Sequence, residues 1–387
     1  MDGEEQSVVV ELIIALVKIA LVVAVIMVLV PFLVWGERKY VADVQVRIGP
    51  NRVGPFGLLQ SLADGIKLMF KEDILPGHVD RVLYFLAPIV MMIPALCVMA
   101  VIPFGNQITL FGHTTRLVVT DLPVGILYVL ALTSLGVYGV VLAGWASNNK
   151  YSLLGGLRSS AQMVSYELPM GLAIVAALMI SSAKGGEMSL VSIVEAQKDG
   201  FWNWNFLWWG IGFLPFLMYW ICGIAETNRA PFDLPEAETE LVAGYHTEYS
   251  GMKFALFFLA EYANMLNVGA IATTLFCGGW HSPIPIEILP KSMGLLKALG
   301  PVFWFSVKVG FFIWAYYHLR ATLPRLRYDR LMGFAWKGLV PLALVNILIV
   351  ATIITLGYRE KPVPPSTSQR PASQAVGMAG QPGPGGF

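Results

Sequence analysis

The chain has 387 residues, of which 56% are hydrophobic and only 13% are charged. Soluble domains carry roughly 25% charged residues, so this composition excludes a soluble globular domain and indicates a protein that crosses the membrane several times. The net charge of +1 and the absence of long basic runs argue against nucleic-acid binding.

Apolar stretches long enough to span a bilayer predict an all-α polytopic membrane protein, with eight transmembrane helices in a single domain over residues 1–358. In chain order, the expected spans are about 8–35, 82–103, 122–146, 160–182, 205–225, 253–279, 301–320 and 336–357. Residues 359–387 are rich in Pro, Gly, Ser and Gln, so we expect them to form a disordered tail.

Lys and Arg residues are distributed unevenly between two sets of loops. The segments 36–81, 147–158, 226–253 and 320–337 hold 16 of them, whereas the opposite set of loops and the termini hold 8. Because positively charged loops tend to stay in the cytoplasm, this bias predicts that the first set is cytoplasmic. Both termini would then lie on the outer side of the membrane.

The long first cytoplasmic loop is expected to begin at Glu37 and to contain an amphipathic helix. Apolar residues recur in it at helical spacing: Leu58, Leu62, Ile66 and Met69. Polar residues cluster on the other side: Asp64, Lys67 and Lys71. Such a helix either lies on the membrane surface as an anchor or packs against a partner protein.

The segment from Glu226 to Tyr249 concentrates acidic residues around a single arginine, Arg229. Its carboxylates are Glu226, Asp233, Glu236, Glu238, Glu240 and Glu248. Like charges that lie close together raise carboxyl pKa values, which suits groups that pass or sense protons. Asp233 and Glu236 also have the spacing of a capping box at a helix N-terminus, so a structural role for these two stays open.

Two further acids, Glu167 and Glu261, fall inside predicted spans. An ionised carboxylate near the middle of the bilayer costs roughly 2.5–3.5 kcal/mol on insertion scales, so such residues normally face the interior of the bundle and mark a function. Together with Glu226 they could form a chain of protonatable sites that enters the membrane. The competing explanation is a structural ion pair with Lys308 or with an arginine of a partner.

The sequence carries no signal for a cofactor or metal held by this chain. Its cysteines, Cys97, Cys222 and Cys277, lie in apolar stretches without CxxC spacing, and its five histidines are scattered. Phosphate-binding glycine motifs are also missing from the sequence. We therefore expect no metal site, nucleotide, flavin or iron–sulfur cluster here, and any electrons would arrive from another subunit.

Six motifs, in one order along the chain, are similar to those of a known family. They are Glu37–Lys39, Arg47–Pro55, Asp64–Lys67, Lys150–Gly155, Ser165–Pro169 and Glu226–Glu238. The sequence resembles the H-type membrane subunit of bacterial respiratory complex I, the NADH-quinone oxidoreductase. Its mitochondrial equivalent is subunit 1 of NADH:ubiquinone oxidoreductase. The likeness covers about residues 8–357.

This resemblance implies a subunit of a proton-pumping enzyme in the bacterial inner membrane. In that family, the chain and the hydrophilic-arm subunits around the terminal iron–sulfur cluster wall a tunnel for quinone, which is the substrate. Other expected partners are small membrane subunits, antiporter-like subunits and lipid, while flavin and iron–sulfur clusters belong to partner subunits. Quinone reduction would be coupled to proton translocation through an acidic loop and buried glutamates.

The resemblance also implies roles for individual residues. The quinone tunnel would include Glu37, Arg38, Asp64, Arg229, Phe232, Asp233 and Tyr245. The proton relay would include Glu167, Glu226, Glu236, Glu238 and Glu261. Direct protonation of quinone is assigned to no residue of this chain, because a partner subunit supplies the groups nearest the headgroup. The third span has no ionisable residue after Asp121, so water or Ser134 would have to bridge the relay there.

Two alternatives stay open at this stage. The first is the equivalent subunit of a membrane-bound hydrogenase-type relative, which shares the eight-helix core but often lacks a complete quinone tunnel. The intact loop Arg47–Pro55 and Arg38 favour quinone use instead. The second is a stand-alone cation transporter, which predicts broken helices in paired halves of the chain. The sequence shows no clear pairing of this kind.

Overall fold

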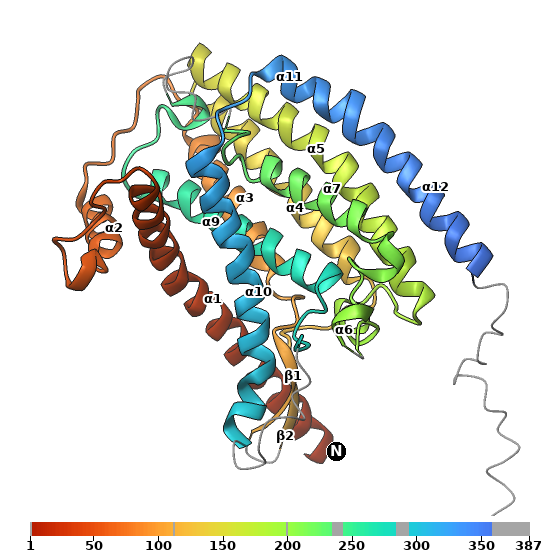
Figure 1. The fold of residues 1–387 in the computed structure, drawn as a ribbon. Coiled ribbons are helices and arrows are strands. Elements are labelled where there is room, and N and C mark those ends of the chain that lie inside the picture. The colour runs from red at the N-terminus through yellow and green to blue at the C-terminus, as the bar shows by residue number, and fades with distance from the viewer. Residues whose placement is uncertain (1, 111–112, 199, 234–242, 284–293, 358–387) are drawn as a thin grey trace, which may run out of the picture.

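A computed structural model describes residues 2–110, 113–198, 200–233, 243–283 and 294–357, and this part of the chain is mostly helical (Figure 1). The longer helices are α1 (Asp2–Val44), α3 (Arg81–Val98), α4 (Gly125–Ala146), α5 (Lys150–Ala183), α7 (Phe213–Glu226), α9 (Gly251–Phe276), α10 (Gly294–Thr322) and α12 (Val340–Gly357). The shorter ones are α2 (Gln60–Phe70), α6 (Leu190–Glu195) and α11 (Tyr328–Gly333).

Six helical stretches are long and apolar enough to cross a membrane. They are Glu11–Val44, α3, α4, α5, α9 and Tyr328–Gly357. A seventh span results if the turns at Phe201–Gly210 and helix α7 are taken together, although the chain bends by 98° between them. The predicted span at 301–320 lies in α10, which is not among the six because Lys308 and several Tyr, Trp and Gly residues reduce its hydropathy. The predicted count of eight is therefore not confirmed.

Two local predictions are wrong. Helix α1 does not end near residue 35 but continues to Val44, so Glu37 and Arg38 are helical and do not begin a loop. The segment after α3 forms an antiparallel hairpin, β1 (Gly105–Leu110) and β2 (His113–Leu117), where only helices were expected. Threonine and isoleucine, which favour strands, are frequent in this hairpin. The helix predicted after the first loop is present as α2.

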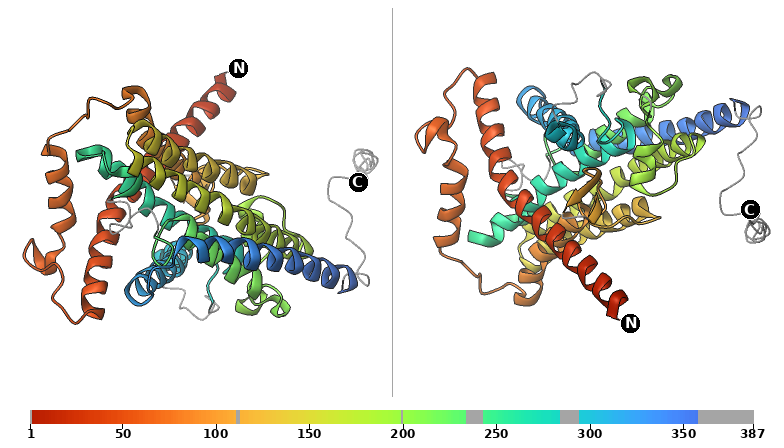
Figure 2. Two further views of the ribbon diagram at one scale, coloured as in Figure 1. Left: turned by 90° about the horizontal axis from the view of Figure 1, so that it is seen from above. Right: turned by 90° about the horizontal axis from the view of Figure 1, so that it is seen from below.

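Helices α3, α4, α5, α7 and α9 pack side by side and form the centre of the molecule, and α12 lies along α5 (Figure 1). Helix α1 packs on this centre through its C-terminal part, whereas its N-terminal part projects from the bundle in both views of Figure 2. Leu12, Leu16 and Leu21 on that projecting part are largely exposed. A long apolar helix with exposed leucines is suited to contact lipid.

Close packing at the centre depends on glycine. A Cβ atom built at Gly156 on α5 would lie 3.2 Å from the Cα atom of Gly144 on α4. One built at Gly155 would lie 2.7 Å from the Cα atom of Gly244, in the loop before α9. Small residues allow membrane helices to approach closely, and van der Waals contact then stabilises their association.

We predict that Gly155→Ala destabilises the fold by about 1–3 kcal/mol, because the added methyl group meets backbone atoms that cannot rotate away. The thermal unfolding temperature of the purified complex and the amount of assembled complex in membranes measure this effect. Gly171→Ala is the matched control on the same helix, since a Cβ atom there has no neighbour within 4 Å among the described residues. Equal unfolding temperatures for the two variants would contradict the packing argument.

Candidate functional site

A buried carboxylate, Glu37 on α1, lies where four segments meet; its residue is only 4% exposed. Its Oε1 atom accepts hydrogen bonds from the guanidinium of Arg320 on α10 and from Nη1 of Arg229, the latter at 3.3 Å. The hydroxyl of Tyr262 on α9 donates to Oε2 at 2.5 Å. Two cations and a hydroxyl thus surround one buried negative charge, which is the arrangement that makes such burial tolerable.

Arg229 follows α7 and carries the positive charge of this cluster. Its guanidinium lies over the Tyr262 ring, 4.3 Å from the ring centre, and its side chain is 8% exposed. Burial by itself would lower the pKa of Arg229, but the negative charge of Glu37, supported by Tyr262 and Glu261, raises it well above its ordinary value. The guanidinium therefore stays charged. Its Nε and Nη2 atoms have no hydrogen-bond partner among the described residues.

The acidic segment after α7 adds a second group of buried polar residues. The Tyr245 hydroxyl donates to Oε1 of Glu261 at 3.0 Å, and both residues are buried. Asp233 forms an ion pair with Arg325 at 3.0 Å. Burial lowers the pKa of His246 to about 4, an effect that the nearby charge of Asp233 opposes, so the imidazole is neutral at pH 7.

The predicted tunnel residues Arg38 and Asp64 lie apart from Glu37. They form an ion pair of 2.5 Å between α1 and α2, and the side chain of Gln60 also donates to Asp64. Both charged side chains are partly exposed, at 48% and 34%. Successive residues on a helix point about 100° apart, so Arg38 faces away from the buried cluster around Glu37.

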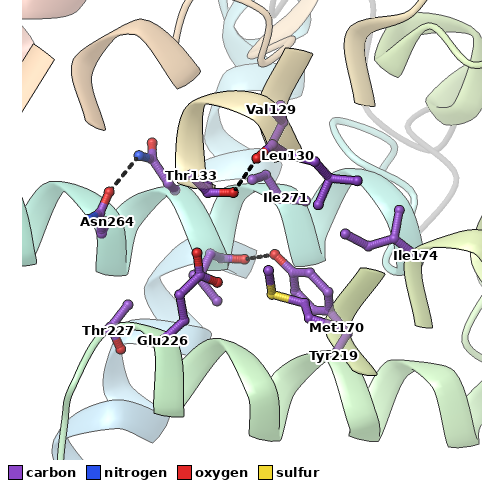
Figure 3. A pocket seen from close by; sticks show the side chains of 12 residues that line it. Val129, Leu130, Thr133, Met170, Ile174, Tyr219, Glu226, Thr227, Asn264 and Ile271 are labelled. Carbon is purple, nitrogen blue, oxygen red and sulfur yellow. Dashed lines mark hydrogen bonds between the residues drawn. The ribbon is translucent and has the colours of Figure 1, made fainter. Parts of the chain in front are cut away.

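Glu226, at the end of α7, lines two adjacent small cavities of about 20 and 10 Å³ (Figure 3). Its Oε2 atom is buried and has no hydrogen-bond partner among the described residues. Glu167 on α5 is close enough for its charge to act on Glu226, and it accepts a hydrogen bond from Ser134 on α4. Ser134, which the sequence offered as a bridge in the third span, thus contacts a predicted relay residue directly.

The predicted site residues fall into three groups. One is a buried cluster that joins Glu37, Arg229, Glu261 and Tyr245. The second is the surface pair Arg38 and Asp64, and the third contains Glu226 and Glu167. Asp233 pairs with Arg325, and Phe232 packs on Tyr166 with ring centres 5.7 Å apart. Glu236 and Glu238 lie outside the described residues, as does the capping-box alternative for Asp233 and Glu236.

Neither of the two cavities is lined by a predicted tunnel residue. Within the part of the chain that the structure describes, no group of three or more His, Cys, Asp or Glu residues could hold a metal ion.

The alternative partner of the membrane acids, Lys308, is engaged elsewhere. Its ammonium group donates to the carbonyl oxygens of Cys277, Gly279 and His281 at 2.7–2.9 Å. An ammonium has three hydrogens to donate, and these three bonds use all of them. The structure therefore gives Lys308 a role at the end of α9 and no ion pair with Glu167 or Glu261.

Sequence reasoning missed the partners of the buried acids: Tyr262, Arg320 and Arg325. The two arginines entered it only as positive charges that orient the protein. A buried carboxylate needs a compensating charge or donor, and this requirement, applied to each membrane acid, would have directed attention to cations at the ends of neighbouring helices.

We predict that Glu37→Gln lowers the stability of the fold by about 3–5 kcal/mol, because two arginines then lose their shared counter-charge inside the bundle. Thermal unfolding of the purified complex would report the loss. The exposed Glu195 provides a control, since Glu195→Gln changes a carboxylate in contact with water. Similar unfolding temperatures for both variants would show that the Glu37 cluster does not hold the helices together.

Comparison with known proteins agrees with these features. A family model described as NADH dehydrogenase matches residues 17–351, which include all the buried acids above. The chain is also similar to a protein of Koribacter versatilis (strain Ellin345), the second H-type subunit of its NADH-quinone oxidoreductase. The two are 52% identical over 355 residues, which make up 89% of this chain and 98% of that protein. The chain therefore belongs to the NADH dehydrogenase family of complex I membrane subunits, whose members are the H-type subunit and subunit 1.

Proposed function

We propose that this chain admits quinone to NADH:quinone oxidoreductase and couples quinone reduction to proton translocation. Its family establishes the coarser statement, a membrane subunit of that oxidoreductase. The observation that carries the finer proposal is the burial of Glu37, Glu226 and Glu261 on helices apolar enough to span a membrane. Charged groups at such positions are costly and are retained where they serve transport or catalysis.

The quinone tunnel would form between this chain and hydrophilic-arm subunits around a terminal iron–sulfur cluster. Support comes from the region of Arg38 and Asp64, where the apolar residues Phe56, Ile66 and Met69 are exposed beside a polar ion pair. An isoprenoid tail needs apolar walls, and a quinone headgroup needs a few polar contacts. Partner subunits would complete the walls, supply the electrons from their own cofactors and protonate the quinone.

The proton relay would begin at the acidic segment. Arg229 interacts with both Glu37 and Glu261, so a change in the charge of one acid alters the field at the other. Glu226 and Glu167 would continue the path, with Ser134 bonded to Glu167 on α4. Two-electron reduction of quinone consumes two protons, and acids inside the bundle are suited to respond to that demand.

The location and the remaining partners belong to the same proposal. The protein would lie in the bacterial inner membrane with both termini outside, next to small membrane subunits and antiporter-like subunits. The excess of Lys and Arg in one set of loops supports this orientation. The relative from Koribacter is named a quinone oxidoreductase subunit, which favours quinone use over a hydrogenase-type role. Family membership disfavours the stand-alone transporter.

We predict that Glu226→Gln leaves the complex assembled but lowers quinone-dependent turnover or the coupled proton uptake about tenfold or more, because the amide cannot carry a proton. NADH oxidation with quinone and acidification of inverted membrane vesicles measure the two quantities. Electron transfer to a hydrophilic acceptor that bypasses quinone should be unchanged. Glu187→Gln, at an exposed position, is the control. Unchanged turnover and proton flux in Glu226→Gln would remove it from the relay.

We predict that Asp64→Asn weakens quinone turnover more than assembly, because it breaks the Arg38 ion pair at the proposed tunnel while costing at most about 1 kcal/mol of stability. The apparent KM for quinone and the maximal rate measure the effect. The control is Asp329→Asn, which breaks an exposed pair with Arg327 of 2.9 Å. An unaltered KM and rate in Asp64→Asn would exclude Asp64 from the tunnel.

A further inference from the structure

The larger of the two cavities at Glu226 has polar atoms on one side and apolar walls elsewhere. Its polar lining includes Glu226, Thr133, Asn264 and Asn267, whereas Val129, Met170 and Ile271 are among the apolar residues. In Figure 3 the carboxyl group of Glu226 points into the space between Asn264 and Thr133. A volume of about 20 Å³ is enough for about one water molecule, provided that the water finds two to four polar partners.

Asn267 on α9 is 2% exposed, and its hydrogen bonds determine which way its amide faces. The Nδ2 atom donates to the carbonyl oxygen of Ala95 at 2.8 Å and to Oδ1 of Asn264 at 3.4 Å. Ala95 lies in the last turn of α3, where helix carbonyls lack a partner within the helix. Because both hydrogens of the amide are used, the remaining atom, Oδ1, can only accept a hydrogen bond.

Two buried acceptors therefore line one cavity without a donor. Oδ1 of Asn267 and Oε2 of Glu226 have no hydrogen-bond partner among the described residues. The Thr133 hydroxyl donates to the carbonyl of Leu130 at 3.0 Å, so it too can offer only acceptor capacity. Buried acceptors of this kind are costly, and a water molecule carries two hydrogens that can satisfy two of them.

We propose that Asn267, Glu226 and Thr133 bind one water molecule between them, and that Asn267 is the residue that positions it on the Glu226 carboxyl. This inference rests on the proposed relay function of Glu226 and deepens it. When Glu226 is ionised, the water donates to Oε2; when Glu226 is protonated, its O–H group donates to the water. Oδ1 of Asn267 accepts from the water in both states, so the water keeps its place while the proton arrives or leaves.

The second cavity does not compete for this role. It is about 10 Å³ in volume and shares Glu226, Thr133 and Asn264 with the first, but Asn267 does not line it. Its volume is at or below the limit for holding a water, and methionine and proline side chains form much of its wall. The Asn267 side is therefore the better site for the water.

Substitution of Asn267 tests the positioning role in the whole complex. Asn267→Leu keeps the size of the side chain but removes the acceptor, and should lower quinone-dependent turnover and proton uptake about tenfold with the complex assembled. The matched control is Asn346→Leu on α12. This asparagine is also 2% exposed, its Nδ2 atom has no partner among the described residues, and it lines neither cavity. Turnover and pumping equal to wild type in an assembled Asn267→Leu complex would overturn the proposal.

Asn267→Asp keeps the proposal testable if the leucine variant fails to assemble. A protonated aspartic acid has the same shape, since its O–H can donate to the carbonyl of Ala95 while its C=O faces the water. Activity should therefore approach wild type at low pH and fall as the pH rises and the new carboxyl ionises. A residue that only filled space would give a pH profile like that of wild type, and this result would count against positioning.

A map of the assembled complex by electron cryomicroscopy, at a resolution that shows ordered water, tests the site directly. We expect a peak about 2.7–3.2 Å from both Oδ1 of Asn267 and Oε2 of Glu226. Both side chains in place with no peak between them would refute the water site. Failure of the relay is a separate outcome, since it would show as unchanged proton flux in Glu226→Gln even where the peak is present.

Discussion

The arrangement of this protein depends on neutralising one carboxylate inside a bundle of apolar helices. Glu37 is placed there by α1, a helix whose other half projects from the molecule (Figure 2). Arg229, Arg320 and Tyr262 come to it from three further segments. Removing one partner of a buried ion pair is more costly than the pair's own contribution to stability. The cluster therefore fixes where α1 meets α9 and α10.

Other charged groups in the bundle follow the same rule with backbone partners. Lys18 on α1 donates to the carbonyls of Arg116 and Val118, which joins the projecting helix to strand β2 and the residue that follows it. Lys184, at the end of α5, donates to the carbonyl of Asn203 at 2.5 Å, and burial lowers its pKa to about 8. These lysines bind carbonyls at the ends of elements, where the backbone lacks internal partners. Their bonds stabilise connections, whereas the acids mark the interior.

The sequence predicted much of the helical core but less of the geometry that relates its polar residues. Apolar runs located the helices that cross the membrane, because hydropathy over about 20 residues is a strong signal. The end of α1 was missed because Glu37 looked like the start of a loop; only a partner from a distant helix makes its burial possible. The hairpin after α3 was missed because short strands leave a weak pattern. The pairs of Glu37 with Arg320 and of Asp233 with Arg325 join residues 283 and 92 positions apart, which one sequence cannot reveal.

The two buried acids Glu37 and Glu226 differ in a way that separates structure from transport. Every oxygen of Glu37 has a charged or hydroxyl donor, so its negative charge is held in place and a proton would have to displace these bonds. Glu226 has no cation bonded to it among the described residues, and one of its oxygens faces a cavity that asparagine and threonine line. A group that carries protons must be able to gain and lose charge without breaking the fold. The environment of Glu226 allows this change, whereas that of Glu37 opposes it, so the acid with fewer partners is the one better suited to carry protons.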